Sequence, residues 1–360
     1  QFQVPVVGVT GSVGKTSTRE MIALALSAEK NVMQTKGNSN SQIGLPLTMF
    51  QFEKEHTAAV IEMGISEFGE MERLVHIAQP NYAVVTNIGI AHIEQLKTRE
   101  HIMHEKLKIA DAFDEYSIMF LNGDDEMLAS ICETTTLPVV YYGTQPWCTY
   151  RAEDIQTDGM KTTFTVHTPT YTSKVTLPVL GIHNVLNALA TIAVCHHMGL
   201  SIEEIAEGFK VFSGTKRRFQ TKFRNENVWI VDDYAHHPTE IQTTIKAAKQ
   251  TNPKRLIVAF QPHRYSRTQL LQKEFGSCFV GADVLVLTDI YAASEDPIEG
   301  ISGKTIVDEV KKQTGVDAVY IEKLEDIAPW LKENIQAGDL IITMGAGNIY
   351  TVGENLAQSL

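Results

Sequence analysis

The sequence predicts an α/β protein of two domains, each built on a mostly parallel sheet. Short apolar runs alternate with helical patterns over residues 1–130, and the same alternation returns over residues 228–360, which is typical of parallel strands joined by helices. Between them, residues 134–179 change to a period-two pattern. The 360 residues also exceed the length at which one hydrophobic core usually stops growing. We therefore expect two domains, residues 1–213 and residues 214–360.

The first predicted domain begins with three strands, each followed by a helical pattern. They are Val6–Val9, Ala58–Glu62 and Tyr82–Thr86. Alternating segments such as Thr162–Val166 and Ser173–Leu177 then predict a small antiparallel appendage between about residues 134 and 179. Helices are expected over residues 183–199 and 201–211. The polar, glycine-containing segment Ser213–Lys216 marks the end of this domain.

The second predicted domain contains further apolar strands separated by helical patterns. This alternation indicates another doubly wound, Rossmann-like α/β unit. The expected strands are Val228–Val231, Leu256–Phe260, Val284–Leu287, Ala318–Ile321 and Leu340–Thr343.

Composition argues against several classes of protein. The hydrophobic fraction of 43% and the charged fraction of 21% are those of an ordinary globular chain and argue against disorder. The formal net charge of −12 disfavours binding to nucleic acid. No apolar run approaches the roughly 20 residues that a membrane helix needs. Four widely spaced cysteines, Cys132, Cys148, Cys195 and Cys278, predict reduced thiols in a cytoplasmic protein.

A glycine-containing loop follows the first predicted strand and opens a helix. Its residues are Gly11, Ser12, Val13, Gly14, Lys15, Thr16 and Ser17. In such loops backbone N–H groups wrap phosphates, a lysine reaches the β- and γ-oxygens, and a hydroxyl binds Mg²⁺. Lys15 and Thr16 occupy those positions, which predicts a P-loop-type ATP site. Val9 stands where the strict spacing has its first glycine, so this is a variant form, and a chance glycine turn is the alternative.

Further magnesium ligands are expected at the ends of neighbouring strands. Glu62 ends one predicted strand, and His92 follows the next one at the expected switch point. The alternatives are a carboxylate satisfied by the following turn for Glu62 and a structural loop histidine for His92.

Several longer segments carry a resemblance to a known family. They are Val9–Thr18, Thr35–Thr48, Ile61–Gly64 and Thr86–Gly89 with His92 in the first domain, and Lys216–Phe219, Asp232–Glu240, Phe260–Thr268 and Gly345–Ile349 in the second. Together they resemble the Mur ligases over nearly the whole chain. The first group is most similar to the member that adds D-alanyl-D-alanine, and the second to the member that joins L-alanine to UDP-N-acetylmuramate. The stretch Tyr291–Glu295 departs from the family pattern, which leaves its role open.

The resemblance implies further site residues in the first domain. Lys106 would be the lysine that many members carbamylate to gain a magnesium ligand, although by sequence alone it would pass for a solvated helix lysine. The motif of His183, Asn184 and Asn187 would contact the adenine end of ATP, with an N-cap cluster as the alternative.

The resemblance also implies contacts to the acceptor substrate and to the γ-phosphate. Asn38 and Asn40 would bind the substrate. In the second domain Arg218 would reach the γ-phosphate, and Asp233 would hold the ribose of ATP. An exposed basic turn is the alternative for the Arg217–Arg218 pair.

An amino-acid site is expected beyond the strand Leu256–Phe260, where open α/β sheets bind ligands. His263, Arg264 and Arg267 follow that strand, and arginine forks suit a carboxyl group. A solvated basic loop is the alternative. The adjacent His236 and His237 lack a third metal ligand, so we expect them to shape a loop and recognise the amino acid.

The implied function is that of an ATP-dependent ligase of peptidoglycan precursor synthesis in the bacterial cytoplasm. ATP would activate a UDP-N-acetylmuramoyl carboxylate as an acyl-phosphate, and a free amino acid, favoured to be L-alanine, would form the amide. Such chemistry needs cations and donors around the γ-phosphate. The expected catalytic residues are Lys15, His92, Lys106 and Arg218, and the expected ligands of Mg²⁺, or alternatively Mn²⁺, are Thr16, Glu62, His92 and carbamylated Lys106.

Other functions stay open at this stage. The chain could add D-alanyl-D-alanine or another amino acid to a longer UDP-muramoyl peptide, or resemble folylpolyglutamate or cyanophycin-type synthetases. From another class, it could be a non-catalytic nucleotide-binding module. Neither nucleic acid nor a membrane is an expected partner, and the oligomeric state is open. The family's N-terminal UDP-binding domain is not recognised before Gln1, so we expect that it was left out or that this member lacks it.

Overall fold

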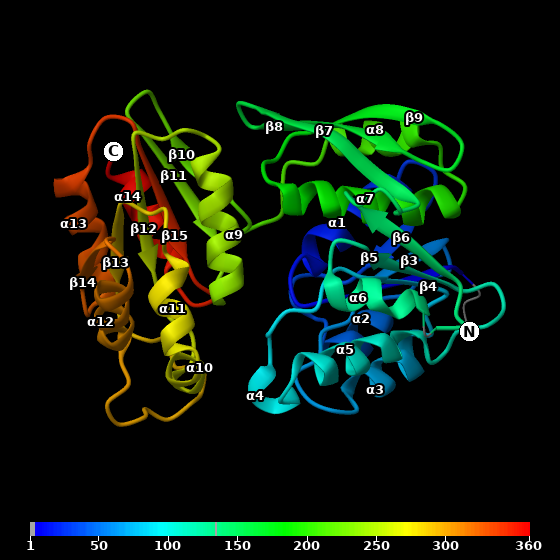
Figure 1. The fold of residues 1–360 in the computed structure, drawn as a ribbon, viewed down its shortest axis with the longest axis horizontal. Helices are drawn as coiled ribbons and strands as arrows, with labels where there is room; N and C mark the ends of the chain where they lie inside the picture. The colour runs from blue at the N-terminus through cyan, green and yellow to red at the C-terminus, as the bar shows by residue number, and fades with distance from the viewer. Residues whose placement is uncertain (1–3, 134) are drawn as a thin grey trace. The chain divides into compact units, whose positions relative to one another are not determined.

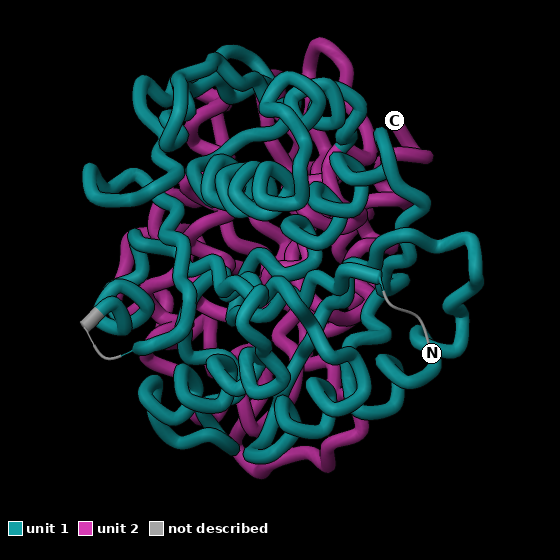
Figure 2. The backbone as a smooth tube through the Cα atoms, turned by 90° about the vertical axis from the view of Figure 1, so that its right-hand side faces the viewer, with its two compact units in different colours: residues 1–213 teal, residues 214–360 magenta. Residues whose placement is uncertain are grey.

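The computed structural model describes residues 4–133 and 135–360. The chain forms two compact units, residues 1–213 and residues 214–360 (Figure 2). Each unit has its own sheet with helices packed against it (Figure 1). Within the described residues, no helix is long and apolar enough to cross a membrane.

The sheet of the first unit has the strand order β2-β3-β1-β4-β5-β6-β7-β8-β9. Its strands are β1 (Val6–Thr10), β2 (Val32–Gln34), β3 (Ala58–Glu62), β4 (Tyr82–Val85), β5 (Ile118–Asn122), β6 (Val139–Gly143), β7 (Tyr150–Asp158), β8 (Lys161–His167) and β9 (Thr172–Leu177). Neighbours from β2 to β7 pair in parallel, whereas β8 pairs antiparallel with both β7 and β9. The expected parallel sheet with an antiparallel extension is therefore confirmed.

The antiparallel part begins later than the sequence predicted. We expected it from about residue 134, but β6 pairs in parallel with β5 and with the start of β7. The reason lies in burial on both faces, because Tyr141 and Tyr142 enter the two opposite cores of the unit. Adjacent buried side chains are typical of a parallel strand covered on both sides.

Helices cover both faces of this sheet, and the β1 side chains show why. Val7 and Val9 enter one core together with residues of α1, α7 and α8, while Val6 enters the other core with residues of α3. The helices are α1 (Lys15–Leu26), α2 (Gly44–Met49), α3 (Glu70–Ala78), α4 (Ile93–Leu96), α5 (Arg99–Leu107), α6 (Glu126–Ala129), α7 (Ile182–His197) and α8 (Ile202–Lys210), with 3₁₀ turns η1 (Lys108–Ala110) and η2 (Ser130–Glu133). The helices expected over residues 183–199 and 201–211 are confirmed as α7 and α8.

The sheet of the second unit has the strand order β10-β11-β15-β12-β13-β14. Its strands are β10 (Gln220–Arg224), β11 (Val228–Asp233), β12 (Arg255–Phe260), β13 (Val284–Leu287), β14 (Asp317–Tyr320) and β15 (Asp339–Met344), and its helices are α9 (Pro238–Lys249), α10 (Tyr265–Leu270), α11 (Gln272–Cys278), α12 (Gly303–Gln313), α13 (Ile327–Asn334) and α14 (Tyr350–Gln358), with the 3₁₀ turn η3 (Leu324–Asp326). Strands β11 to β15 pair in parallel, as predicted. The antiparallel edge strand β10 was not predicted, because its sequence is mostly polar and none of its residues is fully buried.

The strand orders place particular loops together. In the first unit β1 lies between β3 and β4, so the chain crosses β1 on its way from β3 to β4. In the second unit β15 lies between β11 and β12. The carboxyl ends of parallel strands meet at one sheet edge, and ligands bind there where the strand order reverses.

Candidate active site

The predicted phosphate loop joins β1 directly to α1. It contains Gly11 and Gly14, whose φ angles of 143° and 88° favour glycine. A Cβ atom on Gly11 would lie 1.9 Å from the Oγ1 of Thr86, so the loop and the end of β4 are in close contact. The Nζ of Lys15 donates to the carbonyl oxygens of Gly11 at 2.8 Å and Ser12 at 3.1 Å. The strand–loop–helix context that a phosphate loop requires is therefore present.

The segment after β4 holds this loop in place. Thr86 donates from Oγ1 to the carbonyl of Val13 at 2.5 Å, and the Val13 amide donates to Oδ1 of Asn87 at 2.9 Å. The amide of Gly89 donates to Oγ of Ser12 at 2.8 Å. Sequence reasoning gave Thr86 and Asn87 no individual role. Their position directly after a strand adjacent to β1 is the signal that could have found them.

Glu62, at the end of β3, receives three side chains. Its Oε1 accepts from the hydroxyl of Thr16 at 3.3 Å and from Nδ2 of Asn40 at 2.7 Å, and its Oε2 pairs with Arg19 at 3.4 Å. A hydroxyl and a carboxylate side by side at a phosphate loop form the oxygen donor set that Mg²⁺ takes in nucleotide sites. Asn38, by contrast, is exposed.

No three His, Cys, Asp or Glu side chains gather to hold a metal anywhere in residues 4–133 and 135–360. A magnesium ion at Thr16 and Glu62 would therefore depend on phosphate oxygens and water for its other ligands, which is common for this ion. Sequence reasoning also missed Arg19. It lies four residues after Lys15, on the same helix face.

Lys106 is buried next to the same loop. Its side chain, on α5, donates from Nζ to the carbonyl of Gly11 at 3.1 Å. Burial, reinforced by the nearby charge of Lys15, holds the pKa of Lys106 well below its ordinary value. The neutral amine that carbamylation requires is thereby favoured.

His92 precedes α4 in a left-handed conformation with φ of 62°. It follows Gly89, which contacts the phosphate loop, by three residues. The structure thus places His92 in the loop after β4, as the sequence predicted.

The motif at the start of α7 lies beside Gly14. A Cβ atom on Gly14 would lie 2.7 Å from Oδ1 of Asn187, which also accepts from the hydroxyl of Thr18 at 3.1 Å. Asn187 in turn donates to Asn184 at 3.4 Å, and Asn184 lies 3.2 Å from Nε2 of His183. This cluster therefore lies directly against the phosphate loop.

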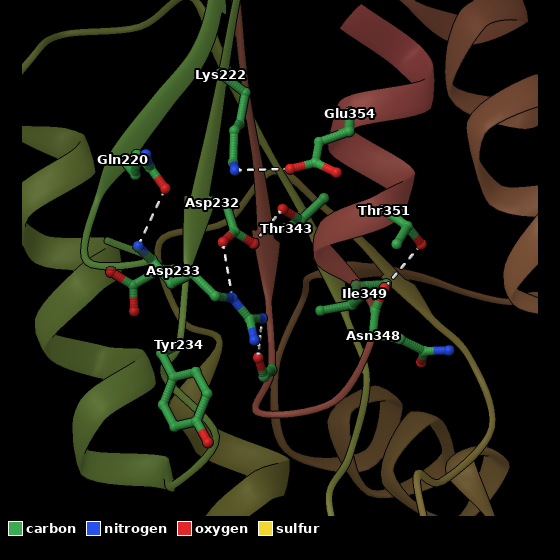
Figure 3. A network of polar contacts seen from close by, with 12 residues as sticks. Gln220, Lys222, Asp232, Asp233, Tyr234, Thr343, Asn348, Ile349, Thr351 and Glu354 are labelled. Atoms are coloured by element: carbon green, nitrogen blue, oxygen red, sulfur yellow. Dashed lines mark hydrogen bonds and ion pairs between the residues drawn. The ribbon is translucent and has the colours of Figure 1, made fainter. Parts of the chain in front are cut away.

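In the second unit, two adjacent arginines have different surroundings. Arg217 donates from Nε to the fully buried Asp232 at 3.0 Å and from its two terminal nitrogens to the carbonyls of Gly347 and Gly345. Arg218 lies over the ring of Tyr234, with its guanidinium carbon 5.3 Å from the ring centre. Figure 3 shows Asp232 and Tyr234 at the carboxyl end of β11.

Asp233 is buried, and each of its oxygens accepts a backbone amide. The amides are those of Phe219 at 2.7 Å and Ala235 at 2.8 Å. Burial raises the pKa of Asp233 to about 6, against the charge of Arg218 and these hydrogen bonds. Asp233 therefore has a structural role in joining the segment before β10 to the end of β11, in addition to any contact with a nucleotide.

Three histidines gather around the loops after β11 and β12. The rings of His236 and His263 meet edge to face with their centres 5.7 Å apart. Burial lowers the pKa of all three imidazoles below the ordinary value. The pKa falls to about 4 for His237 and to about 3 for His263. Glu240 accepts the backbone amides of His236 and His237. These imidazoles are therefore neutral at neutral pH and can accept a hydrogen bond.

The two predicted carboxylate-binding arginines lie on the same loop and the start of α10. Arg267 is buried, and its guanidinium lies 3.4 Å from Nδ1 of His263. Arg264 is more exposed and pairs with Glu295 at 3.7 Å. Glu295 also binds Ser266 through both carboxylate oxygens. Within Tyr291–Glu295, the segment whose role was open, Tyr291 stacks on His263 with an interplanar angle of 11°.

Family models match both units of the chain. The model described as the Mur ligase middle domain matches residues 9–195, and that described as the Mur ligase glutamate ligase domain matches residues 217–347. The chain belongs to the Mur ligase family. As a Mur ligase it is an ATP-dependent enzyme that joins an acid to an amino acid, as the sequence resemblance implied.

Curated relatives of this Mur ligase match it almost from end to end. A UDP-N-acetylmuramate–L-alanine ligase of Desulforamulus reducens is 37% identical over 98% of the chain and 75% of the relative. One from Geotalea uraniireducens is 36% identical over 98% of the chain and 76% of the relative.

Solved structures show the same fold. MurF from Acinetobacter baumannii has a TM-score of 0.86 at 23% identity and covers 99% of the chain and 77% of that structure. The UDP-N-acetylmuramate–alanine ligase MurC from Thermotoga maritima has a TM-score of 0.75 at 27% identity, over 99% and 75% of the two chains. At 23% identity the MurF likeness concerns the fold alone.

Proposed function

We propose that this Mur ligase joins L-alanine to UDP-N-acetylmuramate. The observation that carries the proposal is the 36–37% identity, over 98% of the chain, to enzymes with that activity in their names. The loops after β11 and β12 give independent support, since they combine two arginines with neutral imidazoles at one sheet edge.

The first unit would bind ATP and Mg²⁺. Bound ATP would supply the phosphoryl group that activates the muramoyl carboxylate, and Mg²⁺ would offset the phosphate charge. Lys15, within the loop, would exchange its carbonyl partners for phosphate oxygens. Thr16 and Glu62 would hold the metal, with Asn40 and Arg19 fixing the carboxylate.

Lys106, His92 and Arg218 would complete the charge balance around the transferred group. The lowered pKa of Lys106 supports carbamylation, because only a neutral amine reacts with CO₂. A ¹³C NMR signal from protein exposed to ¹³CO₂, missing in Lys106→Met, would identify the carbamate. Its absence from active wild-type enzyme would remove carbamylated Lys106 from the set of metal ligands. Asn184 and Asn187 would position the nucleotide beside Gly14, and Asp233 its ribose.

The second unit would bind the amino acid. Arg264 and Arg267 suit its carboxylate, because guanidinium forks form paired hydrogen bonds with carboxylate oxygens. His236 and His263 are neutral at neutral pH and could accept a hydrogen bond from the amino group of the amino acid. His237 and Glu240 would shape this loop. A cytoplasmic location for the reaction stays a prediction.

A ligase that adds D-alanyl-D-alanine to a longer UDP-muramoyl peptide is the second candidate. The resemblance of the Thr35–Thr48 segment favours it. The higher identity to L-alanine ligases argues for the first candidate.

Phosphate release distinguishes these candidates. The intact protein is incubated with ATP, Mg²⁺, one UDP-muramoyl acceptor and one amino acid or dipeptide at a time, with Lys15→Ala as the control. We expect release, with matching amide product, only for UDP-N-acetylmuramate with L-alanine. Release only with a UDP-tripeptide and D-alanyl-D-alanine would overturn the substrate assignment, and ATP binding without release under any condition would favour a non-catalytic module.

A further inference from the structure

The side chain of Arg217 connects three loops of the second unit. Its Nε donates to Asp232, at the end of β11, at 3.0 Å. Its terminal nitrogens donate to the carbonyl of Gly345 at 2.6 Å and of Gly347 at 3.2 Å, both after β15. The guanidinium therefore uses its fork to join segments that lie 128 and 130 residues away in the sequence.

Aromatic rings enclose the same guanidinium. Its central carbon lies 4.9 Å from the ring centre of Tyr234 and 4.7 Å from that of Tyr350. Figure 3 shows Tyr234 below the carboxylate of Asp232. A planar cation with these contacts is held in one orientation, which a lysine could not reproduce.

Arg218 depends on the same ring. Its guanidinium carbon lies 5.3 Å from the centre of Tyr234, so both arginines contact one tyrosine. The backbone carbonyl of Arg217 also accepts the amide of Tyr234 at 2.6 Å. Because Arg217 has a left-handed φ of 58°, its conformation sets the direction in which the following residue leaves the turn.

We propose that Arg217 is a positioning residue that aims Arg218 by fixing Tyr234 and the loops after β11 and β15. This inference rests on the proposed function, in which Arg218 acts at the γ-phosphate. Arg217 itself is committed to protein groups, and in this proposal it acts through Arg218.

The chain offers a matched control on the same sheet. Arg255 forms two hydrogen bonds with Asp339 at the amino ends of β12 and β15. The exposed side-chain fractions of Arg217 and Asp232, 21% and 0%, nearly equal those of Arg255 and Asp339, 23% and 1%. Arg217→Ala and Arg255→Ala should therefore lower the urea midpoint of unfolding by similar amounts. Only Arg217→Ala removes contacts at the carboxyl ends of the strands.

The experiment is a double-mutant cycle for kcat with the substrates that give turnover. We expect Arg217→Ala to lose roughly 100-fold in kcat, the loss that a displacement of about 1 Å can cause, and Arg217→Lys to restore little of it. Arg217→Ala combined with Arg218→Ala should lose little more than Arg218→Ala alone, since one residue acts through the other. Arg255→Ala should leave kcat unchanged, both in the wild type and in the Arg218→Ala variant.

An activity-independent measurement keeps this inference separate from the proposed function. In protein labelled with ¹⁵N-arginine, the Arg218 Nε–H signal is identified by its loss in Arg218→Ala. It should shift in Arg217→Ala and stay in place in Arg255→Ala. Equal spectra or equal kcat values in these two variants, or multiplying losses for the two adjacent arginines, would overturn the positioning role. Failure of L-alanine as a substrate would leave the NMR result intact.

Discussion

Replacing Gly11 by alanine tests how the phosphate loop is held. The added Cβ would lie 1.9 Å from Oγ1 of Thr86, a buried hydroxyl that donates to the carbonyl of Val13. Thr86 must therefore move and lose this bond, or the loop must leave its position beside β4. The backbone φ of 143° at Gly11 adds strain for any residue with a side chain.

The expected loss of stability combines three effects. An unfavourable backbone conformation costs about 1–3 kcal/mol, overpacking a close contact about 1–3 kcal/mol, and a lost hydrogen bond about 1 kcal/mol. The total of roughly 3–7 kcal/mol approaches the whole stability of a typical domain, about 5–15 kcal/mol. We also expect ATP binding to be lost, because the loop amides can no longer surround the phosphates.

The assay is urea unfolding of the wild type and variants, followed by circular dichroism, with and without ATP. Gly159→Ala is the matched control. Gly159 has a φ of 57°, but a Cβ atom added there would have no neighbouring atom within 4 Å, so strain alone should cost roughly 1–2 kcal/mol. Adding Thr86→Ala to Gly11→Ala should recover part of the loss, because the closest contact disappears. Equal shifts for Gly11→Ala and Gly159→Ala would refute the contact with Thr86 as the cause.

The remaining predictions concern charge. Burial lowers the pKa of Lys106 below its ordinary value of 10.5, so between the two pKa values the unfolded chain binds more protons and the stability of the protein rises with pH. Lys106→Met should flatten that rise in urea unfolding and abolish ligase activity. An unchanged dependence of stability on pH would contradict the burial argument. Burial lowers the pKa of His237 from 6.5 to about 4, so the free energy of unfolding of the wild type should fall by about 3 kcal/mol as pH falls from 6.5 to 4. The free energy of unfolding of His237→Gln should fall by less, and an equal fall in both proteins would contradict the role of His237. Arg264→Ala should raise KM for the amino acid roughly 10- to 100-fold, the effect of a hydrogen bond to a charged group, with little change in KM for ATP, and equal changes in both would place Arg264 elsewhere in the mechanism.

Much of the fold follows from local patterns in the sequence. Val6 to Val9 predicts a buried strand because adjacent apolar residues can serve the two faces of a covered parallel sheet. The same logic found the central strands of the second unit. It failed for β10, whose Gln220 and Lys222 have no apolar period, because an edge strand is fixed by its partner rather than by burial.

Side-chain roles depended on contacts that the sequence does not contain. Gly11 and Lys15 were identifiable from spacing alone, since backbone geometry and phosphate charge dictate those residue types. Lys106 was not, because a lysine within a helical pattern is usually solvated, and only the packing of α5 against the phosphate loop buries it.

The two adjacent arginines show where sequence reasoning ends. Arg217 and Arg218 have the same chemistry, and both fit an exposed basic turn equally well. What separates them is the carbonyls of Gly345 and Gly347, which β15 brings beside β11. Arg217 is occupied by these groups and by Asp232, so in the proposed function it is Arg218 that acts on the γ-phosphate. If Arg217 aims Arg218 as we propose, the strand order sets the two roles, and a change in the loop after β15 should impair Arg218 without touching it.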